Sequence, residues 1–123
     1  MRKIDAKCST SPLSWSNSVQ RGDVVELRLP KGVGNEQRGH RYGVIVQSDA
    51  LLPRSVVLIA PTSTSARDAT IRPTIDIRGE RTKVLVEQLA ALDVSRFGET
   101  VAKLQGGEMW AIDDAVELVL DLN

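Results

Sequence analysis

The sequence passes from a polar loop directly into an apolar strand at Gly34-Asn35-Glu36-Gln37-Arg38-Gly39-His40-Arg41-Tyr42-Gly43-Val44-Ile45-Val46. The first part is too polar and too rich in glycine for a strand interior, so a strand is predicted over residues 41–47. The loop carries a carboxylate, an imidazole and two guanidinium groups. Guanidinium groups at a strand edge favour binding of an anion there.

A second apolar run, residues 55–60, leads into a predicted polar loop that begins with the hydroxyl groups of Thr62, Ser63 and Thr64. Hydroxyl donors beside a fixed cation suit a phosphodiester. Two alternatives stay open. Thr and Ser after a strand are often turn formers, and an arginine such as Arg41 is often a solvated charge or an ion-pair partner.

Alternating apolar residues predict further strands over residues 24–29, 73–78, 82–87 and 99–105, with a turn at Gly79-Glu80. In the first of these, Val25, Leu27 and Leu29 face one side and Glu26 and Arg28 face the other, which predicts a strand that is buried on one face only. A single helical turn is predicted over residues 93–97. Beyond Gly107 the steps of three and four between Met109, Ile112, Val116 and Val119 predict an amphipathic helix. The pattern predicts a mainly β fold with a C-terminal helix, as a small barrel or strongly bent sheet.

With 123 residues, of which 41% are hydrophobic and 26% charged, the chain is expected to form one domain. Residues 1–20 have no sustained period and are predicted to be a poorly ordered tail, with the domain over residues 21–123. The start is a poor secretory signal and no apolar run could cross a membrane. A lone cysteine, Cys8, favours a reducing compartment, so the expected location is the cytoplasm.

The net charge is zero, but the charges are unevenly distributed. Residues 1–83 hold 14 Lys and Arg against 8 Asp and Glu, and residues 84–123 hold 2 against 8. An anionic ligand is therefore expected to meet the first part, unless the charges are simply scattered over a solvated surface. The zero total argues against a protein that coats nucleic acid without regard to sequence.

One histidine and one cysteine cannot form a His/Cys metal site within a protomer, and no phosphate-binding glycine loop is present, so no metal or cofactor is expected. RNA carries its own nucleophile, since its 2′-hydroxyl can attack the adjacent phosphate. Arg41 and Thr62 are candidates to stabilise the resulting charge, and His40 or Glu36 to transfer a proton. Alternatively His40 is exposed without a role, and Glu36 only holds the loop by pairing with an arginine.

Three blocks in this order resemble the MazF/PemK family of toxin endoribonucleases, across residues 20–122. The first is Arg21-Gly22-Asp23-Val24-Val25 with Gly34-x-Glu36-x-x-x-x-Arg41, the second Ile59-Ala60-Pro61-Thr62-Ser63, and the third Glu87-Gln88 with 93–98. The resemblance implies an SH3-like β-barrel, as in the gyrase poison CcdB, that works as a homodimer. It also implies metal-independent cleavage of single-stranded RNA, commonly mRNA, at short sequences, leaving 2′,3′-cyclic phosphate and 5′-hydroxyl ends. A cognate antitoxin is expected to lay a disordered segment across the RNA groove.

Carried over by position, Arg41 and Thr62 match the family's catalytic residues, Glu36 matches the loop acid, and Gln88 matches a residue that contacts bases. Their neighbours are expected to line the RNA-binding surface: Arg38, His40, Tyr42, Ser63 and Thr64. Tyr42 departs from the family, which usually has proline there, and is either a base-stacking platform or a core aromatic. Trp110 is expected to pack within the protomer or across the dimer.

Two other functions are considered. One is a non-catalytic gyrase poison like CcdB, although the chain lacks the C-terminal aromatic of that branch and ends Leu120-Asp121-Leu122-Asn123. The other is an inactive barrel that binds RNA or an antitoxin, which the change at Tyr42 and Gly43 keeps open.

Overall fold

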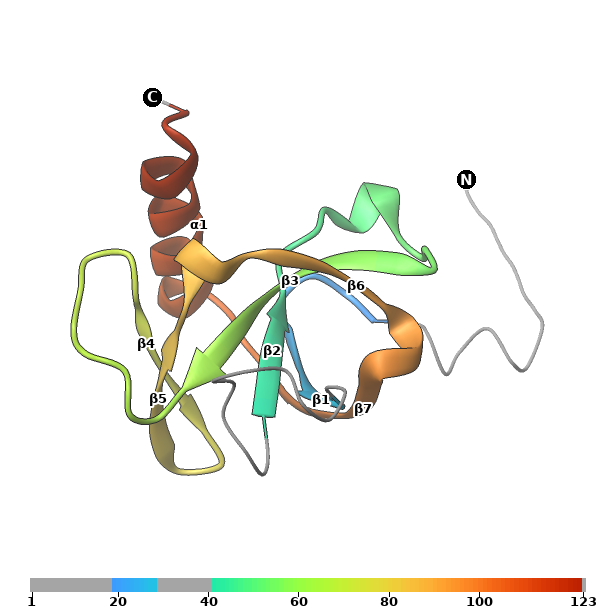
Figure 1. Ribbon diagram of the computed structural model, residues 1–123, viewed down its shortest axis with the longest axis horizontal. Helices are drawn as coiled ribbons and strands as arrows, with labels where there is room; N and C mark the ends of the chain where they lie inside the picture. The colour runs from blue at the N-terminus through green and yellow to red at the C-terminus, as the bar shows by residue number, and fades with distance from the viewer. Residues whose placement is uncertain (1–18, 29–40, 123) are drawn as a thin grey trace.

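The computed structural model describes residues 19–28 and 41–122. Within them, one curled sheet is formed by β1 (Asp23–Leu27), β2 (Arg41–Ile45), β3 (Val56–Ser63), β4 (Thr74–Ile77), β5 (Glu80–Val84), β6 (Ala90–Asp93) and β7 (Phe97–Lys103). The short 3-10 turns η2 (Asp49–Leu51), η3 (Val86–Gln88) and η4 (Val94–Arg96) connect strands, and the helix α1 (Gly107–Leu120) follows β7 (Figure 1). The predicted mainly β fold with a C-terminal helix is confirmed.

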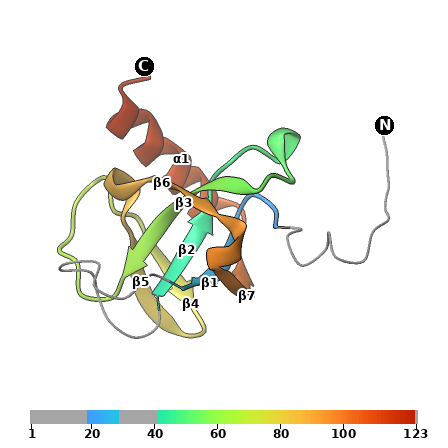
Figure 2. The same cartoon turned by 45° about the vertical axis from the view of Figure 1, so that its right-hand side comes forward.

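The strand β3 is the centre of the sheet, because it changes partner along its length. The strand order is β4-β5-β3-β2-β1-β7, and β6 also pairs with β3. Residues 56–59 of β3 pair with β6, residues 59–61 pair with β2, and residues 62–63 pair with β5. The sheet therefore bends around β3 into a half-barrel, and α1 stands against one of its sides (Figures 1 and 2).

The core consists of two apolar clusters. The helix-side cluster combines Ile112 and Ala115 of α1 with buried sheet residues that include Val24, Val44 and Val84. The second cluster contains Val19, Val25, Leu27, Ile45, Val57, Ile59 and Phe97. Adjacent strand residues point to opposite faces, so Val24 and Val25 enter different clusters. The prediction that only one face of β1 is buried is wrong, since both valines are 0% exposed.

The predicted helix is confirmed, and its apolar stripe faces the sheet. Ile112 is fully buried, and Met109, Val116 and Val119 pack against the helix-side cluster. Trp110 lies on the outer face and is 72% exposed. The expectation that Trp110 packs within the protomer is therefore wrong, while a dimer contact stays a prediction.

The predicted hairpin is confirmed as β4 and β5, but its turn lies one residue earlier, at Arg78-Gly79. Both residues have positive φ, 54° and 86°. Such mirror-image turns match the right-handed twist of the paired strands. The Asp76 carboxylate accepts a hydrogen bond from the Gly79 N–H at 2.7 Å, which holds the turn.

Other elements also differ from the sequence prediction, among them the strand predicted over 82–87, which is β5 and ends at Val84, because residues 86–88 form η3. The strand predicted over 99–105 is β7, which begins at Phe97 and ends at Lys103, and the helical turn before it is confined to Val94–Arg96. The strand β6 was not predicted, because Ala90-Ala91-Leu92-Asp93 does not alternate between apolar and polar residues, and the strand forms by pairing with β3. Finally, β3 continues through Ser63, so the loop predicted from Thr62 starts later.

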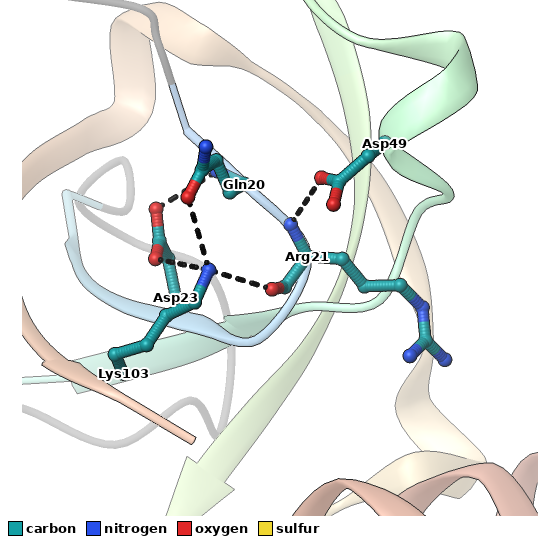
Figure 3. A network of polar contacts seen from close by, with 5 residues as sticks. All are labelled: Gln20, Arg21, Asp23, Asp49 and Lys103. Carbon is teal, nitrogen blue, oxygen red and sulfur yellow. Dashed lines mark hydrogen bonds and ion pairs between the residues drawn. The ribbon is translucent and has the colours of Figure 1, made fainter. Parts of the chain in front are cut away.

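The segment Arg21-Gly22-Asp23 holds the start of β1 in place through polar contacts of Arg21 and Asp23 (Figure 3). The Asp23 carboxylate accepts hydrogen bonds from the Gln20 N–H at 2.8 Å and pairs with the Lys103 ammonium at 3.2 Å. The Arg21 N–H donates to Asp49 at 2.8 Å.

The side chain of Arg21 joins the sheet to the helix. Its Nε donates to the Val46 carbonyl at 3.2 Å, and its guanidinium pairs with Asp113 of α1. Gly22 has a φ of +93°, and it bonds Ile45 through its N–H and Leu104 through its carbonyl, each at 2.8 Å. This block therefore fixes β1, β2 and α1 relative to one another.

Candidate functional site

The two residues predicted to carry the reaction, Arg41 and Thr62, lie on adjacent strands. Arg41 is the first residue of β2 and Thr62 is the last but one of β3. Gly43 pairs with Pro61 in the antiparallel ladder, so the register places Tyr42 opposite Thr62. Arg41 is 5% exposed, which excludes the interpretation of this arginine as a freely solvated surface charge.

The hydroxyl of Thr62 is buried and hydrogen-bonded. Thr62 is 3% exposed, and its Oγ1 donates a hydrogen bond to the Tyr42 carbonyl at 3.1 Å. A hydroxyl has one proton to donate and two lone pairs that accept. To donate to a phosphate, Thr62 must therefore release Tyr42.

The faces of the sheet separate these side chains into two groups. Thr62 shares a face with Tyr42 and Val84, toward the helix-side cluster. Alternation places Arg41 and Ser63 on the opposite face. A phosphate that contacts both Arg41 and Thr62 must therefore lie at the end of β3, where side chains from both faces of the sheet can be reached.

Tyr42 packs against the helix-side cluster and is only partly exposed. This supports its interpretation as a core aromatic over a free stacking platform. Ser63 is 3% exposed, and its Oγ accepts a hydrogen bond from the Ser65 N–H at 3.2 Å. Thr64 is exposed immediately after β3. The hydroxyl groups thus serve partly as turn formers, as one of the sequence interpretations held.

Gln88 is exposed at the end of η3, just after the buried Val86. The preceding residue, Glu87, accepts hydrogen bonds from two nitrogens of Arg72, at 2.9 Å to Nε and 2.8 Å to Nη2. Arg72 also donates to the Arg67 carbonyl at 3.0 Å. The loop after β3 is therefore tied to η3, beside the residue predicted to contact bases.

Sequence reasoning missed Lys83 of β5. Lys83 lies opposite Ser63 in the β3–β5 ladder and donates to the Thr74 hydroxyl at 2.7 Å. Its ammonium also pairs with Asp68 at 2.5 Å. The hydrogen bond from Lys83, together with its charge, holds the pKa of the Asp68 carboxyl below its usual value. The alternation of β5 could have placed Lys83 on one face, but not beside Ser63, because that requires the β3–β5 register.

Three predicted site residues, Glu36, Arg38 and His40, lie outside the described residues. Within residues 19–28 and 41–122, no three His, Cys, Asp or Glu side chains gather in a way that could hold a metal ion. No helix in this part of the chain is long and apolar enough to cross a membrane.

Comparison with known proteins identifies the fold and the family. The structure superposes on a mycobacterial endoribonuclease solved with its cognate antitoxin, with a TM-score of 0.71 at 18% identity, over 86% of this chain and 98% of the other. MazF from Deinococcus radiodurans gives a TM-score of 0.68 at 19% identity, over 84% and 96%. These likenesses confirm the predicted MazF-type barrel.

Sequence relatives agree with the fold. The chain is 39% identical to a protein named as a toxin of Mycobacterium tuberculosis over 90 residues, covering 72% of this chain and 84% of the relative. It is 31% identical to endoribonuclease MazF of Staphylococcus epidermidis, covering 85% and 93%. The family described as PemK-like, MazF-like toxin of type II toxin-antitoxin system matches residues 20–120. The chain therefore belongs to the PemK-like, MazF-like family of type II toxin–antitoxin toxins.

Proposed function

We propose that this toxin is an endoribonuclease that cleaves single-stranded RNA at short sequences, in the cytoplasm and without a metal ion. The observation that carries the proposal is the placement of Arg41 and Thr62 on adjacent strands of a MazF fold. Relatives named endoribonuclease support the same reaction.

In the proposed reaction the 2′-hydroxyl of the RNA attacks the adjacent phosphate. The 5′-oxygen leaves, giving a 2′,3′-cyclic phosphate and a 5′-hydroxyl end. Arg41 stabilises the extra charge of the phosphorane, because its guanidinium is permanently charged and binds two phosphate oxygens at once. Thr62 donates its hydroxyl to the same phosphate after releasing the Tyr42 carbonyl.

The remaining roles follow the position of each residue in the family pattern. Glu36 serves as the loop acid and assists proton transfer. Gln88 is exposed beside the tethered loop and contacts RNA bases. Arg38, His40 and the exposed Thr64 line the RNA-binding surface, whereas Tyr42 packs against the helix-side cluster and Ser63 is only 3% exposed.

The proposed assembly is a homodimer that a cognate antitoxin inhibits. Structures of related toxins have been solved with their antitoxins, one of them MazE with MazF from Deinococcus radiodurans. Exposed apolar side chains on α1, Trp110 at 72% and Leu118 at 51%, are candidates for a contact between protomers. Analytical ultracentrifugation of the purified chain tests the dimer.

The activity is tested by incubating the purified protein with long single-stranded RNA in the presence of EDTA. Discrete fragments are expected, whose 5′ ends a polynucleotide kinase labels without prior phosphatase treatment. Arg41→Ala should lower the rate by about 100- to 1000-fold. Arg54→Ala is the matched control, because Arg54 is exposed and its Nε contacts only the Leu51 carbonyl among the described hydrogen bonds.

Intact RNA at high protein concentration would refute the proposal, as would equal cleavage by wild type and Arg41→Ala. Inhibition of DNA supercoiling without RNA cleavage would indicate a gyrase poison. RNA binding without any cleavage product would indicate an inactive barrel.

A further inference from the structure

Lys83 is the residue beside the proposed site whose contacts point to a ligand. It lies on β5, directly opposite Ser63 of β3 and Thr74 of β4. Its side chain is only 22% exposed, yet its ammonium pairs with the carboxylate of Asp68, a loop residue that is 89% exposed. The Lys83 ammonium is thus held in place by the sheet and binds an exposed carboxylate, as expected of an anion-binding site.

The ladders align Lys83 with Arg41. Residues directly opposite each other in antiparallel strands share a face of the sheet. Continuing the β2–β3 register from Gly43 and Pro61 by two residues places Arg41 opposite Ser63. Arg41, Ser63 and Lys83 thus form one row on three adjacent strands. Two strand spacings separate the backbones of the two cations, about 10 Å.

The lysine is positioned independently of Asp68. The Lys83 ammonium donates to the Thr74 hydroxyl at 2.7 Å, which orients the side chain across β4. An ammonium has three N–H donors, and Thr74 and Asp68 use two of them. The site can therefore bind a larger anion in place of Asp68. The carboxylate of Asp68 lies in solvent, and an exposed ion pair contributes little to stability. Exchange of this carboxylate for a phosphate is therefore easy.

From these contacts we infer that Lys83 is a second phosphate-binding cation of the RNA groove, and that Asp68 occupies its anion site until RNA displaces it. The inference rests on the proposed ribonuclease function. Arg41 binds the phosphate that is cleaved, and Lys83 binds a neighbouring phosphate of the same strand. The tether from Arg72 to Glu87 keeps the loop that carries Asp68 close to β5.

The test measures how RNA affinity depends on salt. The probe is a 2′-O-methylated copy of the RNA segment that the wild type cleaves, since it cannot supply the attacking hydroxyl. Each phosphate contact to a single strand contributes about 0.7 to the slope of log affinity against log salt. Lys83→Met should lose that increment. Raising the salt from about 50 to about 200 mM should therefore reduce the RNA affinity of this variant by a factor about 2.5-fold smaller than the factor for the wild type. Lys83→Arg should retain the wild-type slope.

Asp68→Asn tests the other half of the inference on a side chain too exposed to affect folding. It should raise RNA affinity at low salt by about 1.4- to 5-fold, the range for removing one exposed competing ion pair. This gain should vanish in the Lys83→Met background, because the two residues act on the same site. Asp114→Asn on the outer face of α1 controls for net charge, and Lys103→Met on β7 controls for loss of an ion-paired lysine.

The two proposals fail in different ways. If the wild type does not cleave RNA, the proposed function falls and this inference falls with it. If the wild type cleaves RNA but Lys83→Met retains the full salt slope, only this inference is overturned. An Asp68→Asn gain that persists in the Lys83→Met background, or that Asp114→Asn reproduces, also overturns it, because the effect is then one of general charge.

Discussion

Substitutions of Thr62 can show whether its hydroxyl group takes part in catalysis. Its hydroxyl is buried and donates to the Tyr42 carbonyl, so it has a structural function even without RNA. The proposed reaction requires the same proton to be donated to a phosphate. Substitutions that separate the hydroxyl from the methyl group distinguish these two functions.

The magnitudes follow from the surroundings of the side chain. Thr62→Val keeps the shape but leaves the Tyr42 carbonyl without its donor, which costs about 1 kcal/mol. Thr62→Ser keeps the hydroxyl but removes a buried methyl group, which costs about 0.8 kcal/mol. Both variants should therefore melt about 4 °C below the wild type. Their activities should differ, because only Thr62→Val lacks the hydroxyl, with an expected loss of about 100- to 1000-fold in rate.

The assay is single-turnover cleavage of RNA with protein in excess, well below the melting temperature of either variant. Thermal unfolding followed by circular dichroism provides the stability comparison. Thr62→Ser should cleave within about tenfold of the wild type, since it loses no donor.

Equal cleavage rates for Thr62→Val and Thr62→Ser would refute a catalytic role for this hydroxyl and leave only its bond to Tyr42. In that case Ser63→Ala becomes the informative variant, because Ser63 shares the face of Arg41 at the end of β3. A loss of rate in Ser63→Ala alone would move the hydroxyl donor by one residue.

Three further predictions concern the fold. Ile112→Ala empties a fully buried position in the core and should lower the free energy of unfolding by about 2–5 kcal/mol, measured by urea denaturation. Gly22→Ala should destabilise by about 1–3 kcal/mol, because φ is +93° and the added Cβ would lie 3.0 Å from the Leu104 carbonyl oxygen, whereas Gly107→Ala, with no atom within 4 Å, should be tolerated. The hydrogen bond from the Ser95 N–H lowers the pKa of Asp93 from 3.8, so this carboxylate stabilises the folded state above that pH and the stabilisation is lost as the pH falls through the lowered value. The difference in Tm between wild type and Asp93→Ala should accordingly be present at neutral pH and shrink below pH 3.8; a difference that stays constant with pH would contradict this.

Local sequence patterns were sufficient to predict those elements whose hydrogen bonds join residues close in sequence. The steps of three and four from Met109 to Val119 predicted α1 correctly, since a helix bonds to itself and needs only one apolar stripe. Alternation with a glycine turn likewise predicted the β4–β5 hairpin, with an error of one residue in the turn. The short β6 escaped detection because it exists only through pairing with β3.

The sequence by itself determined the family, the fold class and the candidate residues Arg41 and Thr62. Glycine-rich loops, strand periods and the order of motifs can be recognised from the sequence without knowing which residues meet in the fold. Only the tertiary structure decided that Thr62 is buried against the Tyr42 carbonyl, that Arg41 and Ser63 share a face, and that Lys83 joins their row. These facts depend on ladder register and on the bend at β3. Register joins residues about 20 positions apart in sequence, as Ser63 and Lys83 are, and no local period encodes which of them meet.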